Sequence, residues 1–207
     1  MRWLVGAVAV VVAVGSPVAI YYGLQHYSVR QVSLFALAVA VALLFVRFRR
    51  VDRKHLRAVL RIPAVVLALI GLSAVLDDPR FMLALPSLIN VAMFVTFAST
   101  LRGPITLVER FARLQLGDDI DARQIAHCRQ ATVAWCAFFL FNASAAGALV
   151  LWAPLAWWAA YNSSISYGLM GVMFAGEYIV RQYRFRSYGR GLHDRLLSLL
   201  FPPEAPE

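Results

Sequence analysis

Long apolar stretches separated by short polar segments run along the whole chain. Six of them approach the roughly 20 residues that a helix needs to cross the hydrocarbon core of a bilayer. They lie at about residues 3–24, 29–46, 62–76, 81–101, 131–152 and 157–180. The second and third are short for a span, so we expect arginine side chains at their ends to reach outward to the lipid headgroups. The pattern predicts an all-α, polytopic integral membrane protein with six transmembrane helices.

Short turns connect three pairs of these stretches, near residues 25–28, 77–80 and 153–156. Pro79 and Pro154 suit sharp stops between helices, because proline cannot continue a helix through its interior. The first stretch also permits a second interpretation as a cleaved signal peptide, with a basic residue at Arg2 and small residues at 13–16. Cleavage would leave the orientation of the other spans unchanged.

The composition supports a membrane protein. Of the 207 residues, 61% are hydrophobic and 15% are charged. Soluble domains are nearer 45–50% apolar and about 25% charged. Mean hydropathy is +0.67. These values disfavour both a water-soluble globule and a disordered chain, and we expect one membrane domain over residues 1–207.

The charges are strongly one-sided. The net charge of +9 would by itself suggest nucleic acid. However, 18 Lys and Arg residues fall on one side of the predicted spans, and only Arg30 and Arg80 fall on the other. This follows the positive-inside rule. Both termini should therefore be cytoplasmic, and we expect no nucleic-acid partner.

The loop over residues 47–61 holds seven basic residues in fifteen. Each basic residue near a membrane surface attracts anionic lipid by about 1 kcal/mol. The loop could also attract an acidic soluble partner, although orientation of the spans alone explains its charge. Candidate docking residues are Arg47, Arg49, Arg50, Arg53, Lys54 and Arg57.

The segment 102–130 is expected to contain helical structure in addition to a loop. An amphipathic helix is expected over about 104–116, with Pro104 in its first turn and Gly117 after its end. Such a helix suits the inner membrane interface. Its apolar face would hold Leu107, Val108, Phe111 and Leu114. Its polar face would hold Thr106, Glu109, Arg110 and Arg113.

An acidic cluster follows this helix at residues 118–121. It has two interpretations. It could hold Mg²⁺ beside a diphosphate substrate, or Asp121 could form a capping box with Gln124 and start the next helix. Further along, the cytoplasmic tail over 181–207 contains an apolar run at 192–201, which predicts a second interfacial helix.

Glu177 is the main candidate for chemistry, because ionisable residues within spans are costly and mark functional sites. It lies one turn before Arg181, which allows an ion pair spaced i,i+4. The short turn at 153–156 makes the last two spans antiparallel neighbours. This arrangement places Arg129 and Thr132 at the same membrane depth as Glu177. Guanidinium groups bind phosphates and carboxylates through paired hydrogen bonds. The candidates for an anionic headgroup are Arg102, Arg110, Arg113, Arg129, Tyr178, Arg181 and Arg184.

Other polar residues point less clearly to chemistry. For Asn90, Asn142 and Asn162 a structural role is the simpler interpretation, and Asn142 could hydrogen-bond across helices. His127 and Cys128 are adjacent on a helix and point about 100° apart, so they make a poor catalytic dyad. The sequence has no phosphate-binding glycine loop and no metal-type spacing of Cys and His, so neither a metal nor a cofactor is expected.

Four short motifs between residues 100 and 186 resemble a family of uncharacterised bacterial inner-membrane proteins. They are Arg110-Phe111-Ala112-Arg113-Leu114, Arg129-x-x-Thr132-x-x-Trp135, Asn162, and Phe174-x-x-Glu177-Tyr178-x-x-Arg181. Members tend to be encoded in clusters for aryl polyene and xanthomonadin-type pigments, beside acyl carrier proteins and ketosynthases. The resemblance implies a multi-pass protein of the bacterial inner membrane that helps to make, anchor or pass on an acyl or polyene product. It adds Thr132, Trp135 and Asn162 to the candidate headgroup-binding residues.

Several functions remain compatible with the sequence. The first is a non-catalytic accessory protein whose basic face docks an acyl carrier protein or a soluble biosynthetic enzyme. The second is a membrane-embedded transferase that acts on a lipid or acyl substrate with Glu177 and neighbouring arginines. The third is a small transporter or flippase, for which the polar line through the spans is thin and no inverted repeat is evident. A structural subunit of a larger complex would also fit.

Overall fold

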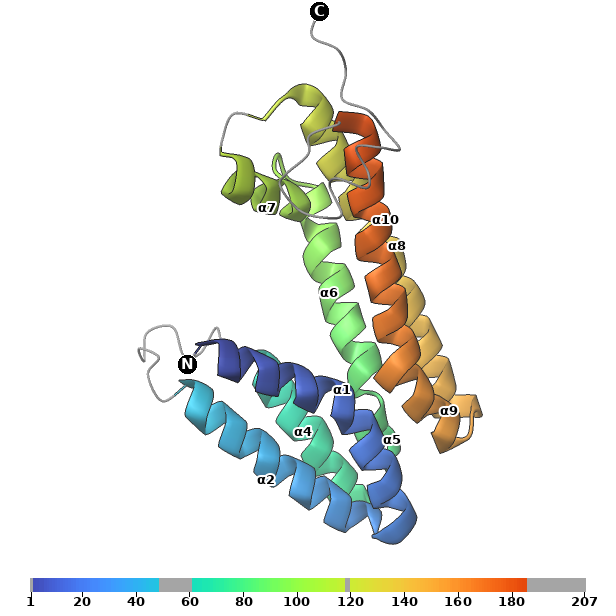
Figure 1. Cartoon of the computed structure of the whole chain (residues 1–207). Helices are drawn as coiled ribbons and strands as arrows, with labels where there is room; N and C mark the ends of the chain where they lie inside the picture. Colours follow the sequence, from blue (N-terminus) through green and yellow to red (C-terminus); the bar gives the residue numbers. More distant parts are fainter. Residues whose placement is uncertain (1, 49–60, 118–119, 186–207) are drawn as a thin grey trace, which may run out of the picture. The chain divides into compact units, whose positions relative to one another are not determined.

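A computed structural model describes residues 2–48, 61–117 and 120–185 (Figure 1). All regular elements in these ranges are helices, which confirms the all-α prediction there. They are α1 (Arg2–His26), α2 (Val29–Phe48), α4 (Arg61–Leu76), α5 (Arg80–Leu83), α6 (Leu85–Leu101), α7 (Leu107–Leu116), α8 (Ala122–Trp152), α9 (Leu155–Ala160), the π-helix η1 (Tyr161–Ile165) and α10 (Ser166–Phe185).

The predicted turns coincide with helix ends. Helix α1 ends at His26, α4 ends at Leu76 and α8 ends at Trp152. Asp77 follows α4 with φ of 53°, a left-handed conformation that aspartate tolerates better than most residues. Pro154 provides the N-cap of α9 in an extended conformation. The turn residues in the sequence therefore predicted these helix ends correctly.

Three predicted stretches differ from the helices that form. The stretch at 81–101 is divided at Ala84 into α5 and α6. Pro86 lies just beyond this break and cannot donate a backbone hydrogen bond to the preceding turn. Helix α8 begins at Ala122, nine residues before the apolar stretch at 131–152, at the start that the Asp121 capping box predicted. The last stretch contains the π-helix η1, which the apolar pattern did not indicate.

The chain divides into two compact units. The first takes its described residues from 1–91 and 141–166, and the second takes them from 92–140 and 167–185. The first division falls within α6 and the second within α8. Each unit has a buried core of its own.

Helices α2 and α4 pack against each other in the first unit (Figure 1). Ser33 and Ser73 are fully buried between them. The Ser33 hydroxyl donates to Ser73 Oγ at 3.1 Å, and the Ser73 hydroxyl donates to the Asp78 carbonyl at 2.8 Å. Such small hydroxyl residues allow two helices to approach closely and satisfy each other's polar groups.

Trp158 forms the centre of the first unit's core. It is 1% exposed and packs with Leu83 and Ala159, and Ile20 and Leu24 of α1 contact this cluster. Its indole Nε1 donates to the Leu83 carbonyl at 3.0 Å. This bond satisfies the polar atom of a buried tryptophan, as burial requires.

Asn142 joins α8 to the residues after the turn, as the sequence predicted. Its side-chain oxygen accepts hydrogen bonds from the Tyr161 hydroxyl at 2.9 Å and the Ser166 hydroxyl at 3.0 Å. Nearby, the Ser87 hydroxyl of α6 donates to the Ala143 carbonyl at 2.7 Å. A Cβ on Gly147 would lie 3.3 Å from Ser87 Oγ, so glycine permits this approach.

The second unit is built on an aromatic core. Phe97 of α6 packs with Trp135, Cys136 and Phe139 of α8. The rings of Trp135 and Phe174 meet at 4.7 Å between centroids, which joins α8 to α10. Figure 1 shows α8 and α10 running side by side here, which agrees with the predicted antiparallel pair.

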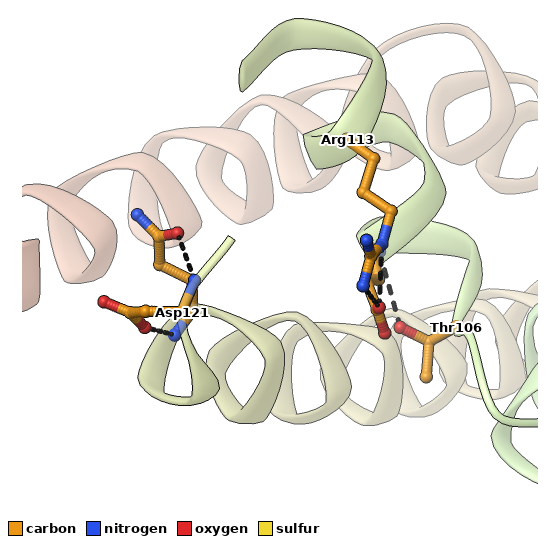
Figure 2. A network of polar contacts seen from close by, with 5 residues as sticks. Thr106, Arg113 and Asp121 are labelled. Carbon is orange, nitrogen blue, oxygen red and sulfur yellow. Dashed lines mark hydrogen bonds and ion pairs between the residues drawn. The ribbon is translucent and has the colours of Figure 1, made fainter. Parts of the chain in front are cut away.

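Helix α7 begins later than predicted. It starts at Leu107, not near residue 104, because Thr106 is its N-cap. The Thr106 hydroxyl accepts from the Glu109 backbone N–H at 3.4 Å (Figure 2). The predicted end is confirmed, since Gly117 follows the helix with φ of 93°. Glycine adopts this left-handed conformation without the strain that a side chain would add.

The capping-box interpretation of Asp121 is confirmed. The Gln124 backbone N–H donates to Asp121 Oδ1 at 2.6 Å, and the Asp121 backbone N–H donates to Gln124 Oε1 at 3.1 Å (Figure 2). These reciprocal bonds satisfy two donors at the start of α8. Asp118 and Asp119, the other acidic residues of the predicted Mg²⁺ cluster, lie outside the described residues, as does the predicted interfacial helix at 192–201.

Two helical stretches are long and apolar enough to cross a membrane. They are Arg80–Leu101, which joins α5 and α6, and Ala122–Trp152. Shorter apolar helices lie at Val29–Phe45 and Pro63–Leu76. By length and composition, these two stretches are compatible with membrane association.

Candidate ionisable site on helices α7, α8 and α10

A buried histidine faces a carboxylate in the second unit. His127 Nε2 of α8 lies 3.4 Å from Glu177 Oε1 of α10. The His127 side chain is 7% exposed and that of Glu177 is 22% exposed. Among the described residues, neither ring nitrogen of His127 has a hydrogen-bond partner. Leaving buried polar atoms unpaired costs about 1–3 kcal/mol, which is a reason to look for a function at this pair.

The antiparallel arrangement of α8 and α10 brings the two residues together. The His127 ring meets the Phe185 ring edge-on, at 5.4 Å between centroids and 80° between planes. This aromatic contact holds the imidazole against α10. Glu177 lies two turns earlier on the same helix, toward the aromatic core. The Glu177 side chain is the more exposed member of the pair.

A second carboxylate is buried on α7. Glu109 Oε1 accepts from Arg113 Nε at 3.0 Å and from Arg113 Nη2 at 2.8 Å (Figure 2). The Glu109 side chain is only 3% exposed. The sequence placed Glu109 on the polar face of this helix. In the structure Thr106 and Glu109 of that face are buried while Arg110 is exposed, and Arg113 compensates the buried charge of Glu109.

Burial and charge both act on His127, which precedes the apolar stretch at 131–152. Burial lowers the pKa of His127 below its usual 6.5, and the Glu177 carboxylate partly opposes this shift. The cationic Arg184 and Arg181 lower the pKa of His127 further. The imidazole is therefore neutral near pH 7 and can accept a proton.

Stability should depend on pH through His127. The unfolded chain binds a proton on this histidine near pH 6.5, whereas the folded chain binds it only at lower pH. The free energy of unfolding should thus be highest above pH 6.5 and should fall as the pH is lowered toward the folded pKa. Thermal unfolding of wild type and His127→Gln on both sides of pH 6.5 checks this. Equal pH dependence in both proteins would contradict it.

The arginine candidates make different contacts from those expected. Arg181 places its guanidinium 5.4 Å from the centroid of the Tyr178 ring, and among the described residues it makes no ion pair with Glu177. Arg129 donates to the Leu101 carbonyl at 2.7 Å, which ties the start of α8 to the end of α6. Arg184 donates to the Gln130 side chain.

The remaining candidates divide into buried and exposed residues. Thr132 is fully buried and donates to the Cys128 carbonyl at 2.8 Å, while Trp135 belongs to the aromatic core. Asn162 belongs to the other unit and donates to the Trp158 carbonyl at 2.8 Å. Arg102 and Arg110 are exposed. The backbone of Arg47 lies in α2, and Arg49, Arg50, Arg53, Lys54 and Arg57 lie outside the described residues.

His127 is the residue that sequence reasoning missed. Its neighbour Cys128 makes a poor dyad with it, and no aspartate follows it four residues later. Burial raises the pKa of the Cys128 thiol, and the Glu109 and Glu177 carboxylates raise it further, so the thiol stays protonated. The depth argument that placed Arg129 and Thr132 near Glu177 would have reached His127 within one turn.

The structure and the comparisons define only a broad class. Among the described residues, no group of three or more His, Cys, Asp or Glu side chains could hold a metal ion. No protein-family model, curated protein or solved structure matches the chain. The chain is a helical protein with two helices that could cross a membrane, and it carries a histidine–carboxylate pair beside arginines.

Proposed function

We propose that this chain is a multi-pass protein of the bacterial inner membrane, with six spans and cytoplasmic termini. Its many exposed apolar side chains support this proposal. Phe35, Phe45, Val75 and Val172 are among the large hydrophobic residues that remain exposed on the described helices. Soluble monomers rarely expose extended apolar surface, whereas lipid covers such surface at no cost.

Within the membrane, the protein acts as an accessory protein for an acyl or polyene-type lipid product. The single observation that carries this is the 18:2 distribution of basic residues, which concentrates positive charge on one face. Such a face would attract an acidic acyl carrier protein or a soluble biosynthetic enzyme with an acidic surface. The resemblance of the motifs between residues 100 and 186 to inner-membrane proteins of aryl polyene clusters supports the same product class.

Recruitment of an acyl carrier protein to membrane vesicles tests this function. The Arg49→Glu/Arg50→Glu/Arg53→Glu variant should abolish salt-sensitive recruitment, because it reverses charge on the proposed docking loop. Arg80→Glu on the opposite side is the matched control and should leave recruitment unchanged. Equal recruitment by the triple variant and wild type would reject the docking function.

The His127–Glu177 pair favours a second candidate, a membrane-embedded transferase. Here Glu177 would orient His127 or exchange a proton with it. The arginines would hold an anionic substrate group. Glu177→Gln should stop product formation in cells, because an amide cannot accept the proton. Protection of the buried Cys128 and Cys136 from maleimide would show that the variant folds. Full product formation by folded Glu177→Gln would exclude this candidate.

The asparagine contacts do not favour a transporter. Asn90 donates to the Pro86 carbonyl at 2.9 Å and Asn162 to the Trp158 carbonyl, both within their own helical segments. Asn142 is engaged by Tyr161 and Ser166. These three side chains serve helix structure and packing instead of lining a polar path.

A further inference from the structure

Helix α7 presents an unusual division of its side chains. Thr106 and Glu109 are buried, and Leu107 and Val108 pack against the aromatic core of the second unit. Its outward side carries Phe111 and Leu114, which are 55% and 82% exposed. The packing of Leu107 and Val108 on the core holds the helix in this rotation.

The position of α7 in the chain limits what can cover this outward side. The helix follows the candidate span Arg80–Leu101 after five residues and precedes the candidate span Ala122–Trp152 after five more. Arg129 joins the first turns of α8 to the last residue of α6 through the Leu101 carbonyl. Helix α7 therefore lies at the common end of the two helices that could cross a membrane.

The described part of the second unit is rich in arginine. The described residues of this unit include seven arginines but only three acidic residues, Glu109, Asp121 and Glu177. Glu109 is already paired with Arg113. Arg110 is exposed next to Phe111, so a positive side chain borders the apolar residues. An apolar strip bordered by arginine is the pattern of helices that lie in the headgroup layer.

We propose that the outward side of α7 docks into the anionic headgroup layer of the inner leaflet. Phe111 and Leu114 enter the boundary with the acyl chains, and Arg110 contacts lipid phosphate. This assignment rests on the proposed membrane location and adds a defined lipid-contact face to it. It differs from the apolar face expected from sequence, because Leu107 and Val108 pack against the core.

Nitroxide labels on the protein in nanodiscs test this proposal. A label at Leu114→Cys should collide more with oxygen than with a water-soluble nickel complex, whereas a label at exposed Arg123→Cys should show the reverse. Wild type, whose two cysteines are buried, gives the background labelling. Adding Arg110→Glu should move the Leu114 label toward water in phosphatidylglycerol discs. The label should also lie deeper there than in pure phosphatidylcholine discs.

A label at Leu140→Cys separates the two proposals, because Leu140 is exposed on α8 within a candidate span. Water contact at Leu114 with lipid contact at Leu140 would overturn the docking of α7 alone. Water contact at both would contradict the membrane location as well. Dipolar broadening between Leu114 labels would show that a second copy covers this side, and it would overturn lipid docking. Equal depth in both lipids would overturn the anionic preference.

Discussion

Trp158→Ala is expected to lower the free energy of unfolding by about 3–5 kcal/mol, the cost of emptying a large buried site. Trp158 is 1% exposed and is surrounded by Leu83, Ala159 and residues of α1. In a lipid environment the variant mainly loses van der Waals packing around position 158, because an apolar side chain gains little by moving from lipid into an apolar protein core. The indole bond to the Leu83 carbonyl is lost as well.

Trp158→Phe is the matched control for this loss. Phenylalanine keeps most of the ring volume but cannot donate to Leu83, so we expect a loss of about 1 kcal/mol. Far-UV circular dichroism of thermal unfolding in detergent measures both variants. Equal melting temperatures of the Trp158→Ala and Trp158→Phe proteins would show that this cluster does not hold the first unit together.

Asn142→Leu is expected to cost about 1–3 kcal/mol. Asn142 is 1% exposed, and its oxygen accepts from both Tyr161 and Ser166. Leucine is similar in size but leaves two hydroxyl donors without this acceptor. The effect should appear as a lower melting temperature at unchanged helix content.

Asn90→Leu provides the comparison. Asn90 bonds only to the Pro86 carbonyl one turn earlier, so its replacement should change stability by less than about 0.5 kcal/mol. Equal losses at positions 90 and 142 would contradict the role assigned to the cross-segment bonds. Melting of both variants in one detergent provides the measurement.

Helix ends were largely predictable from the sequence, and the rotation of helices was not. Pro154, Gly117 and the Asp121–Gln124 capping box act within a few residues, so their effect is visible in sequence. The inward turn of Glu109 depends on Arg113 and on the core beneath α7. An amphipathic pattern predicts that all apolar residues of a helix face the same apolar environment. Helix α7 instead packs on protein with one side and leaves Phe111 exposed on the other.

The candidate site shows the same limit. Glu177 was found because a carboxylate in an apolar stretch is costly. Its partner was missed because a hairpin fixes depth but not which side of each helix faces the other. His127 faces Glu177, while Arg129 reaches back to Leu101. The π-helix at Tyr161–Ile165 left no residue pattern that would have revealed it.

Sidedness of two exposed arginines tests the membrane account most directly. Arg80 is the first residue of one candidate span, Arg123 lies near the start of the other, and both are exposed. In intact spheroplasts a membrane-impermeant maleimide should label Arg80→Cys, and it should label Arg123→Cys only after permeabilisation. Wild type, with both cysteines buried, sets the background. Labelling of both positions from the same side, or release of the protein by alkaline carbonate, would contradict the account.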